Sequence, residues 1–285
     1  MEGFAYYCER YGKLGDISLP LSDRSVFFGD AVYDAAIGRQ GRVLFEGEHI
    51  NRFTSNAARL GFSEIPEGEE LSRIFSELIA FSGFSEYFIY FQLSATKSTR
   101  QHSRGGAGAS LLVTVTPYTP PSPDKTLKLI TYPDKRYGYC DIKTVNLLPA
   151  VLASTAAEDA GADEAVFYRG DEVTECAHSN ISILKSGTLV THPTDERILP
   201  GITRAHMLVA AERLGIGVEE RPFTISELFS ADEVIVSSTT KFCLAAEKIN
   251  DRRVGGSDKK RVKALAAALF EEYFRQDSAK RQEYC

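Results

Sequence analysis

Two segments near the start of the chain carry apolar residues at helical spacing. Over residues 46–60 and again over 69–81, apolar side chains recur every three or four positions, as in a helix with one buried face. Residues 87–93 and 111–115 are instead runs of β-branched and aromatic residues, which favour strands. These patterns predict a sheet combined with helices over residues 1–118. Shorter strand-like runs precede the helices at FAYYC, ISLPL and AVYDAAIGR.

Three prolines in four positions interrupt these patterns after residue 119. We therefore expect a linker over 119–124, between an N-terminal domain (1–118) and a C-terminal domain (125–285). The second domain mixes strands with helices, so the predicted fold class is α+β. Its expected elements are a strand at 127–132, a helix at about 147–160, a helix after Gly201 and a last amphipathic helix near 259–275.

The composition is that of an ordinary globular protein. The 285 residues are 43% hydrophobic and 25% charged, which excludes disorder along the whole chain. Lys and Arg number 33 against 39 Asp and Glu, giving a net charge of −6, and this balance argues against a nucleic-acid partner. No apolar run approaches the roughly 20 residues that cross a bilayer, and charges stand where a signal peptide is apolar. We expect a cytoplasmic protein without a membrane partner.

The five cysteines lie far apart, with no two within three residues of each other. This scatter excludes zinc ribbons and CxxC redox pairs, and it is typical of reduced thiols in the cytosol. The sequence predicts no metal site. It also lacks a P-loop motif, and GGAG at 105–108 is interpreted as a loop because it lacks the strand-then-helix setting of a dinucleotide site.

Two segments in the second half have the features of a phosphate-binding cup. LPGITR predicts a helix start, where the backbone amides of Ile202 and Thr203 and the helix dipole attract an anion. A second group of small residues, Ser237, Ser238, Thr239 and Thr240, follows a predicted strand and offers hydroxyl and amide donors. Each segment alone also fits a purely structural role, because most helix starts bind no ligand.

Lys143 and Glu175 each have two interpretations. Lys143 lies between a predicted strand and a predicted helix, where a solvated surface lysine is common. The alternative is an imine-forming amine, which needs a buried, aromatic or cationic setting. Glu175 lies on a short predicted strand and fits either a turn carboxylate or a partner for a protonated heterocycle. Position alone does not decide between them.

In order and spacing, these segments resemble the class IV (fold-type IV) aminotransferases, which use pyridoxal 5'-phosphate. Within the class, RQH at 100–102, DIK at 141–143 and SSTT at 237–240 are most similar to the D-amino acid (D-alanine) aminotransferases. The likeness runs from about Gly12 to Gly256. It rests on FFGDAVYDAAIGRQGRVLFEGEHINRF, DIKTVNLLPAVLA, AGADEAVFYRGDEVTECAHSNISILKSGTLVTHP, ILPGITR and VSSTTKFCLAAEKINDR.

The resemblance implies a fold-type IV enzyme with a small α/β N-terminal domain and a larger, mixed, β-barrel-like C-terminal domain. It implies that Lys143 holds pyridoxal 5'-phosphate as an internal aldimine and then moves the substrate proton. Glu175 would keep the pyridine nitrogen protonated, which makes the ring a strong electron sink, and Arg136 would shape the electrostatics of Lys143. The residues that would bind the phosphate are Arg52, Ile202, Thr203, Ser238 and Thr239.

The same resemblance implies a substrate. Tyr33, Arg100 and His102 match the residues that bind the substrate carboxylate in the D-specific subgroup, where a guanidinium fork and neutral donors form the trap. The position of the carboxylate relative to Lys143 would select the enantiomer. The resemblance thus implies an enzyme that moves the amino group between D-amino acids (D-alanine, D-glutamate) and 2-oxo acids. It also implies a homodimer, because family members complete each active site with residues of the neighbouring subunit.

The sequence departs from the family pattern at two places. CAH at 176–178 replaces the small residues that usually follow the glutamate, and it would reshape the pocket for the substrate side chain. SATK at 94–97 replaces the Thr-Arg-Gly of the D-specific subgroup.

Three alternatives follow. Two have the same fold: a branched-chain L-amino acid aminotransferase and an aminodeoxychorismate lyase. They differ from the first interpretation in the carboxylate trap. Changing Arg100 to Ala should reduce D-alanine turnover specifically if the first interpretation is correct, and this result distinguishes it from the other two. The third is a protein that binds the vitamin without turnover. The pair of Lys143 and Glu175 argues against it, because storage needs no electron-sink partner.

Overall fold

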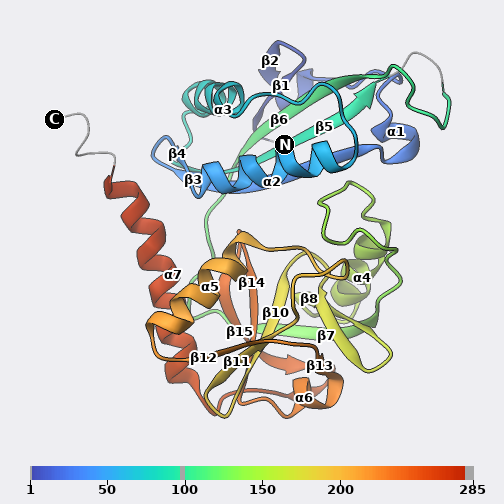
Figure 1. Cartoon of the computed structure of the whole chain (residues 1–285). Coiled ribbons are helices and arrows are strands. Elements are labelled where there is room, and N and C mark those ends of the chain that lie inside the picture. The colour runs from blue at the N-terminus through green and yellow to red at the C-terminus, as the bar shows by residue number, and fades with distance from the viewer. Residues whose placement is uncertain (1, 97–99, 280–285) are drawn as a thin grey trace. The chain divides into compact units, whose positions relative to one another are not determined.

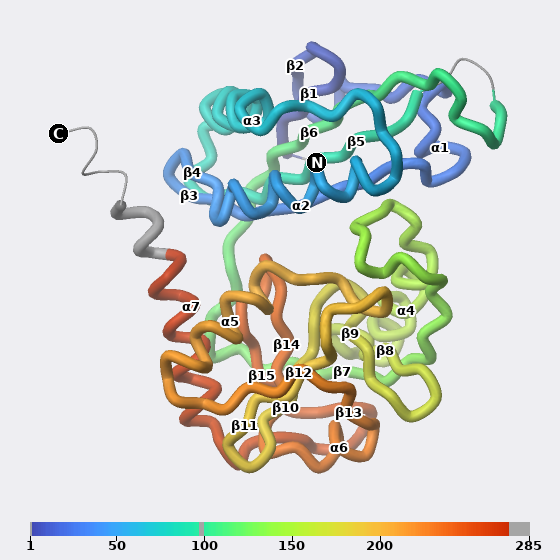
Figure 2. Tube along the Cα trace, viewed as in Figure 1, coloured from blue at the N-terminus to red at the C-terminus, as the bar shows by residue number. Residues whose placement is uncertain are grey.

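The chain folds as two compact units. The computed structural model describes residues 2–96 and 100–279. The first unit runs to Thr119 and also contains Ile142–Asn146. The second comprises Pro120–Asp141 and Leu147–Gln276. Figures 1 and 2 draw the backbone of both units. The break after Thr119 falls at the start of the proline-rich segment. The segment around Lys143, which the sequence alone assigns to the second domain, is part of the first unit.

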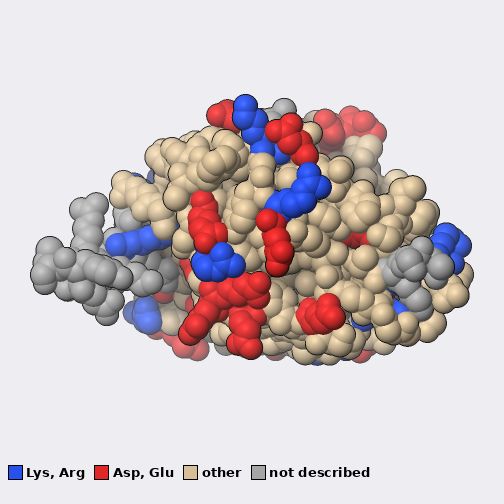
Figure 3. Space-filling model, turned by 90° about the horizontal axis from the view of Figure 1, so that it is seen from above, with Lys and Arg blue, Asp and Glu red and all other residues tan. Residues whose placement is uncertain are grey.

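The surface carries charges of both signs. On the face drawn in Figure 3, acidic side chains form the larger groups and basic side chains lie between them, as a net charge of −6 would suggest. Among the described residues, no helix combines the length and hydropathy that a membrane span requires. Within the same residues, no group of His, Cys, Asp and Glu side chains is arranged to hold a metal ion.

The first unit is built on a six-stranded antiparallel sheet with the strand order β2-β1-β6-β5-β3-β4. The long central strands β5 and β6 pair from Tyr87 opposite Pro117 to Thr96 opposite Gly108. The two runs of β-branched and aromatic residues form these strands, as predicted. The strands are β1 (Phe4–Tyr7), β2 (Arg10–Lys13), β3 (Ala31–Arg39), β4 (Arg42–Val43), β5 (Glu86–Thr96) and β6 (Gly108–Pro117).

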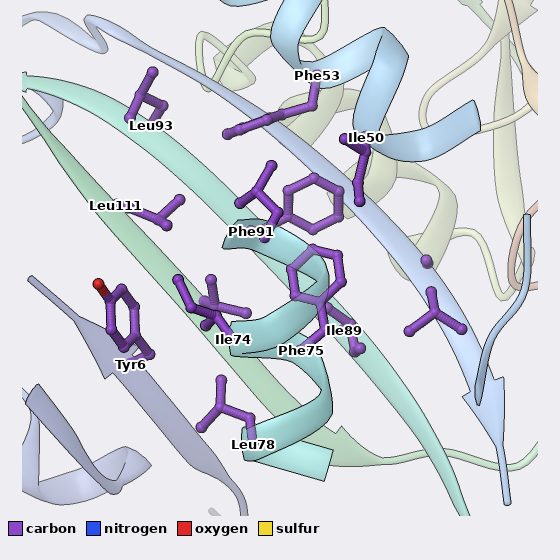
Figure 4. Packing of buried hydrophobic residues seen from close by; sticks show 14 of the residues in the cluster. Tyr6, Ile50, Phe53, Ile74, Phe75, Leu78, Ile89, Phe91, Leu93 and Leu111 are labelled. Carbon is purple, nitrogen blue, oxygen red and sulfur yellow. The ribbon is translucent and has the colours of Figure 1, made fainter. Parts of the chain in front are cut away.

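Helices α2 (Glu46–Arg59) and α3 (Gly68–Ser82) pack their apolar faces on this sheet. Phe53 of α2 and Phe75 of α3 both contact Phe91 of β5, with ring centroids 4.8 and 4.9 Å apart (Figure 4). Burying three such rings contributes several kcal/mol to folding at roughly 25 cal/mol per Å². The helices that the periodicity predicts at 46–60 and 69–81 are confirmed.

One predicted strand is wrong. ISLPL, at 17–21, forms no strand, because Pro20 has no N–H to donate to a ladder and its carbonyl instead accepts from the backbone N–H of Asp23. Two short helical turns, η1 (Leu14–Asp16) and α1 (Ser25–Phe28), flank this segment.

The second unit contains a curled, mixed ten-stranded sheet, a half-barrel with the order β12-β11-β10-β14-β15-β7-β8-β9-β13 and with β16 beside β15. The pairs β15·β7, β7·β8 and β11·β12 are parallel, and the others are antiparallel. The strands are β7 (Leu127–Pro133), β8 (Glu164–Arg169), β9 (Glu172–Cys176), β10 (Asn180–Lys185), β11 (Thr188–Thr191), β12 (Gly217–Glu220), β13 (Phe223–Thr224), β14 (Glu233–Ser238), β15 (Phe242–Ile249) and β16 (Arg252–Arg253).

Helices cover this sheet on its outer side. α5 (Ile202–Arg213) and α7 (Lys259–Ala279) share one apolar cluster with the strands, and α4 (Leu148–Asp159) packs two alanines on β8. A capping box on Thr224 and Glu227 begins the short helix α6 (Ile225–Phe229). Both units thus combine sheet and helix, and the predicted α+β class is confirmed.

Candidate active site

Lys143 lies on an extended segment beside strand β3. The backbone N–H of Tyr33 donates to the Lys143 carbonyl at 2.9 Å, and Val145 donates to Ala31 at 3.3 Å. The half-buried ammonium of Lys143 lies 4.5 Å from the centroid of the Tyr33 ring, a cation–π contact. Tyr33 in turn stacks on Tyr90, with centroids 5.3 Å apart. The structure therefore brings together two of the residues that the sequence singles out, Lys143 and Tyr33.

Arg52 is fixed by a buried aspartate. From α2 it donates Nε and Nη2 to the carboxylate of Asp34 at 2.7 and 2.8 Å, and His49 Nδ1 lies 2.8 Å from the same group. Burial would raise the pKa of Asp34, but the charge of Arg52 and the hydrogen bond from His49 outweigh it and hold that pKa well below its usual range. A guanidinium clamped in this way has one orientation.

Arg100 and His102 are exposed residues of the loop that follows β5. The Phe28 ring lies beside both, with its centroid 5.1 Å from the Arg100 guanidinium carbon and 5.2 Å from the His102 ring. The contacts of the first unit thus place Arg100 and His102 in one group around Phe28, and Tyr33 in another with Lys143. Lys97, part of the second departure from the family pattern, lies outside the described residues.

The backbone of this loop is held by Arg24. Its guanidinium donates to the carbonyls of Gln101 and His102, the latter at 2.8 Å, and its Nε donates to Asp30 at 2.7 Å. Arg104 also donates its Nε to this carboxylate, at 2.9 Å. Burial would raise the pKa of Asp30, but the hydrogen bonds of the two arginines outweigh it and lower that pKa.

Glu175 is a buried carboxylate near the end of β9. It forms an ion pair with Arg136, and it accepts from the backbone N–H of Leu199 and from Asn180 Nδ2, each at 3.1 Å. Burial would lower the pKa of Arg136, but the charges of Glu175 and Asp134 outweigh it and raise that pKa. The sequence relates Arg136 to Lys143, whereas the structure shows its contact with Glu175.

The start of α5 is an uncapped helix N-terminus that carries Ile202 and Thr203. Its N-cap is Gly201, without a side-chain hydrogen bond, so the first amides lack the usual capping partner. A Cβ on Gly201 would lie 2.0 Å from Asn180 Oδ1, so only glycine fits there. Ser237 pairs with Asn180 across the strands and shares its face of the sheet. Among the described residues, the buried Ser237 hydroxyl has no hydrogen-bond partner.

Ser238 and Thr239 lie at the tight hairpin between β14 and β15. Ser238 Oγ lies 3.3 Å from Thr240 Oγ1 and accepts the backbone N–H of Lys241 at 3.1 Å. Phe242 closes the hairpin opposite Ser238 with a positive φ of 54°, a conformation that is strained for a non-glycine residue. The hairpin and α5 belong to the same unit. Residues of α5 pack in one apolar cluster with residues of β14 and β15, the two strands that the hairpin joins.

The His178 side chain is turned toward a buried charge pair. Its Nδ1 lies 2.9 Å from the carboxylate of Glu164, which also pairs with Lys241. Burial would raise the pKa of Glu164, but His178 and Lys241 outweigh it and lower that pKa to about 2. Sequence reasoning missed Glu164 and Lys241, since no local pattern indicates a contact between residues 77 positions apart.

Comparison with known proteins shows to which family the chain belongs. Residues 31–249 match the profile of the family described as amino-transferase class IV. The chain belongs to the class IV aminotransferases. Among its relatives is the D-alanine aminotransferase of Listeria monocytogenes serotype 4b, 36% identical over 231 residues, which are 79% of this chain and 80% of that protein. The D-alanine aminotransferase of Bacillus licheniformis is 34% identical over 86% of this chain and 88% of its own length.

Solved structures show the same fold. A branched-chain aminotransferase from Thermoproteus uzoniensis matches with a TM-score of 0.83 and 24% identity, covering 94% of this chain and 95% of that one. A putative 4-amino-4-deoxychorismate lyase from Legionella pneumophila matches with a TM-score of 0.81, 21% identity and coverage of 90% and 96%. A branched-chain aminotransferase from Thermobaculum terrenum in its PLP-form matches with a TM-score of 0.82, 19% identity and 95% coverage of each chain.

These findings confirm the fold-type IV architecture and the aminotransferase class. At such low identity, the branched-chain enzymes and the lyase are relatives in fold. The two alternatives that share this fold therefore gain no support beyond the architecture itself.

Proposed function

We propose that this aminotransferase moves the amino group between D-amino acids, D-alanine and D-glutamate among them, and 2-oxo acids with pyridoxal 5'-phosphate as cofactor. The observation that carries the proposal is the set of D-alanine aminotransferases at 33–36% identity over 79–92% of this chain. The structural neighbours with other printed activities are 19–24% identical.

The second unit fits the two ends of this cofactor. The uncapped start of α5, the hydroxyl of Ser237 and the donors of Ser238 and Thr239 suit a phosphate group. Glu175, held in one orientation by three donors, suits a protonated ring nitrogen. Arg52, pre-oriented by Asp34, would add charge to the phosphate, and Lys143 would hold the cofactor through its amine.

When bound, the cofactor supplies an electron sink for the electron pair left on the substrate Cα. Lys143 would move the proton: its freed amine would accept the proton from the substrate Cα and donate it to the carbon on the other side of the amino nitrogen. The hydrogen bond between Tyr33 and the Lys143 carbonyl fixes the lysine backbone, and the Tyr33 ring fixes where Nζ lies. Arg100 and His102 would bind the substrate carboxylate, so their position selects the enantiomer whose Cα proton faces Nζ.

The exposed face of α4 supports a homodimer. Its small residues face the sheet, while Leu148, Val151 and Leu152 are 68%, 54% and 53% exposed. Three large apolar side chains in adjacent turns of one helix are typical of an interface. The four described cysteines are free thiols, which supports a reducing compartment, the cytoplasm.

An amino-donor panel tests the proposed function. Cofactor-loaded protein receives D-alanine, D-glutamate or L-leucine as donor and a 2-oxo acid as acceptor, and the 2-oxo product is quantified. Transfer from the D-amino acids alone is expected. Transfer from L-leucine alone would replace the proposed activity with the branched-chain activity. Transfer from none of the three donors would refute both substrate assignments.

A further inference from the structure

Glu164, the first residue of β8, is a fully buried carboxylate. It accepts the backbone N–H of His178 at 2.9 Å and the hydroxyl of Ser179 at 3.0 Å, and it forms an ion pair with Lys241. A buried charge is costly unless such donors compensate it. The folded chain must therefore keep these donors close to Glu164.

The donors come from two segments that have distinct tasks in the proposed function. His178 and Ser179 form the turn that directly follows Glu175 and Cys176, with the Cys176 N–H bonded to the Ser179 carbonyl at 2.7 Å. Lys241 belongs to the hairpin that carries Ser238 and Thr239. One buried carboxylate thus joins the segment suited to the ring nitrogen to the segment suited to the phosphate.

The backbone of Lys241 is also hydrogen-bonded within the hairpin. Its backbone N–H bonds to Ser238 Oγ at 3.1 Å, so a shift of Lys241 moves Ser238. On the other side the hairpin is anchored by Phe242, which is buried against Phe270 and Tyr273 at centroid distances of 4.9 and 5.3 Å. The ion pair with Glu164 supplies the second anchor.

The same contacts explain the residue that departs from the family pattern. The imidazole of His178 has its Nδ1 2.9 Å from Glu164 and 3.3 Å from the Lys241 ammonium. A small residue at this position has no side chain that can reach either partner. The His178 side chain therefore contacts both members of the Glu164–Lys241 pair.

We propose that Lys241, acting through Glu164 with His178, is a positioning residue that fixes the spacing between the Ser238–Thr239 hairpin and the Glu175 turn. The inference rests on the proposed function, because it takes pyridoxal 5'-phosphate as the ligand of both segments. It assigns Lys241 no contact with the reacting atoms.

The test is the affinity of the apoprotein for pyridoxal 5'-phosphate, measured by calorimetry. Lys241→Met keeps the apolar stem and removes the ammonium, and we expect about tenfold weaker binding, as for the loss of a charge-assisted contact. Lys248→Met is the matched control, because Lys248 pairs with the fully exposed Asp251. Its affinity should equal that of the wild type, and equal affinities for Lys241→Met and wild type would overturn the inference.

A double variant separates positioning from the cost of an uncompensated charge. Lys241→Met with Glu164→Gln leaves no unpaired carboxylate, so the melting temperature of the apoprotein should recover toward the wild-type value. The affinity should stay low, because the anchor of the hairpin is still missing. Recovery of both would show that the single variant acted through the buried charge alone and would refute the positioning role. A wild-type protein that binds no pyridoxal 5'-phosphate would instead refute the proposed function.

Discussion

Arg100 is the single residue on which the substrate assignment depends most. It is exposed and rests against Phe28, so its removal leaves the core intact. Arg100→Ala should lower kcat/KM for D-alanine about 100-fold, the effect of losing a guanidinium–carboxylate pair of roughly 2–3 kcal/mol. Steady-state kinetics measures this, with Arg73→Ala on the exposed face of α3 as the control. Undiminished D-alanine turnover would mean that Arg100 does not bind the carboxylate.

Glu164 gives the protein a pH-dependent contribution to stability. Its pKa falls from 4.5 to about 2 on folding, because His178 and Lys241 outweigh the effect of burial. A lowered pKa stabilises the fold above the unfolded value, and this contribution is lost as the pH falls from 4.5 towards 2. Denaturant unfolding at pH 7 and at pH 3 measures how much unfolding free energy is lost in acid. This loss should be smaller in Glu164→Gln than in the wild type. Equal losses would contradict the lowered pKa.

At the scale of elements, the sequence predicts what depends on local pattern. The periodicity of α2 and α3 and the apolar runs of β5 and β6 identify those elements, because each buries one face or both. The extended segment around Lys143 escapes prediction. Its backbone partners are Ala31 and Tyr33 of β3, more than a hundred residues earlier, and no local signal reports such a pairing.

The loop that carries Arg100 and His102 depends on Arg24. Only a forked guanidinium can reach the Gln101 and His102 carbonyls and the Asp30 carboxylate together. Arg24→Lys keeps the charge but loses the fork, so we expect KM for D-alanine to rise about tenfold with little change in cofactor affinity. Arg73→Lys serves as the control in the same kinetic assay. An unchanged KM would show that the loop holds its shape without Arg24.

At the scale of the whole molecule, the family resemblance predicts the site residues, and the structure shows the contacts that hold the predicted residues in place. The sequence motifs point to Lys143, Glu175 and the start of α5, because each of these motifs is a contiguous stretch of the chain. The sequence does not predict the contact of Asn180 with Gly201 or that of Glu164 with Lys241, since only the folded sheet and the segments packed on it bring these residues together. The sequence also places the Lys143 segment with the second domain, and the fold places it with the first unit.

The exposed face of α4 leads to a prediction about assembly. Val151→Glu introduces a charge into a face that is apolar and exposed, so the fold should survive while the proposed homodimer dissociates. Light scattering coupled to size exclusion should show a halved mass. Leu214→Glu, at the end of α5 and 45% exposed, is the matched control and should remain dimeric. A dimer in both variants would locate the interface elsewhere.

The central claim is that Lys143 serves a D-selective transaminase, and one half-reaction tests it most directly. Cofactor-loaded protein is mixed with D-alanine or with L-alanine in the absence of any acceptor, and the absorbance band of the bound cofactor is followed. The two donors carry the same substituents in mirror-image arrangement, so a difference between them reports stereoselectivity and not the size or chemistry of the side chain. The account predicts bleaching by D-alanine and none by L-alanine, and no bleaching by either in Lys143→Ala. Bleaching by L-alanine alone would contradict it.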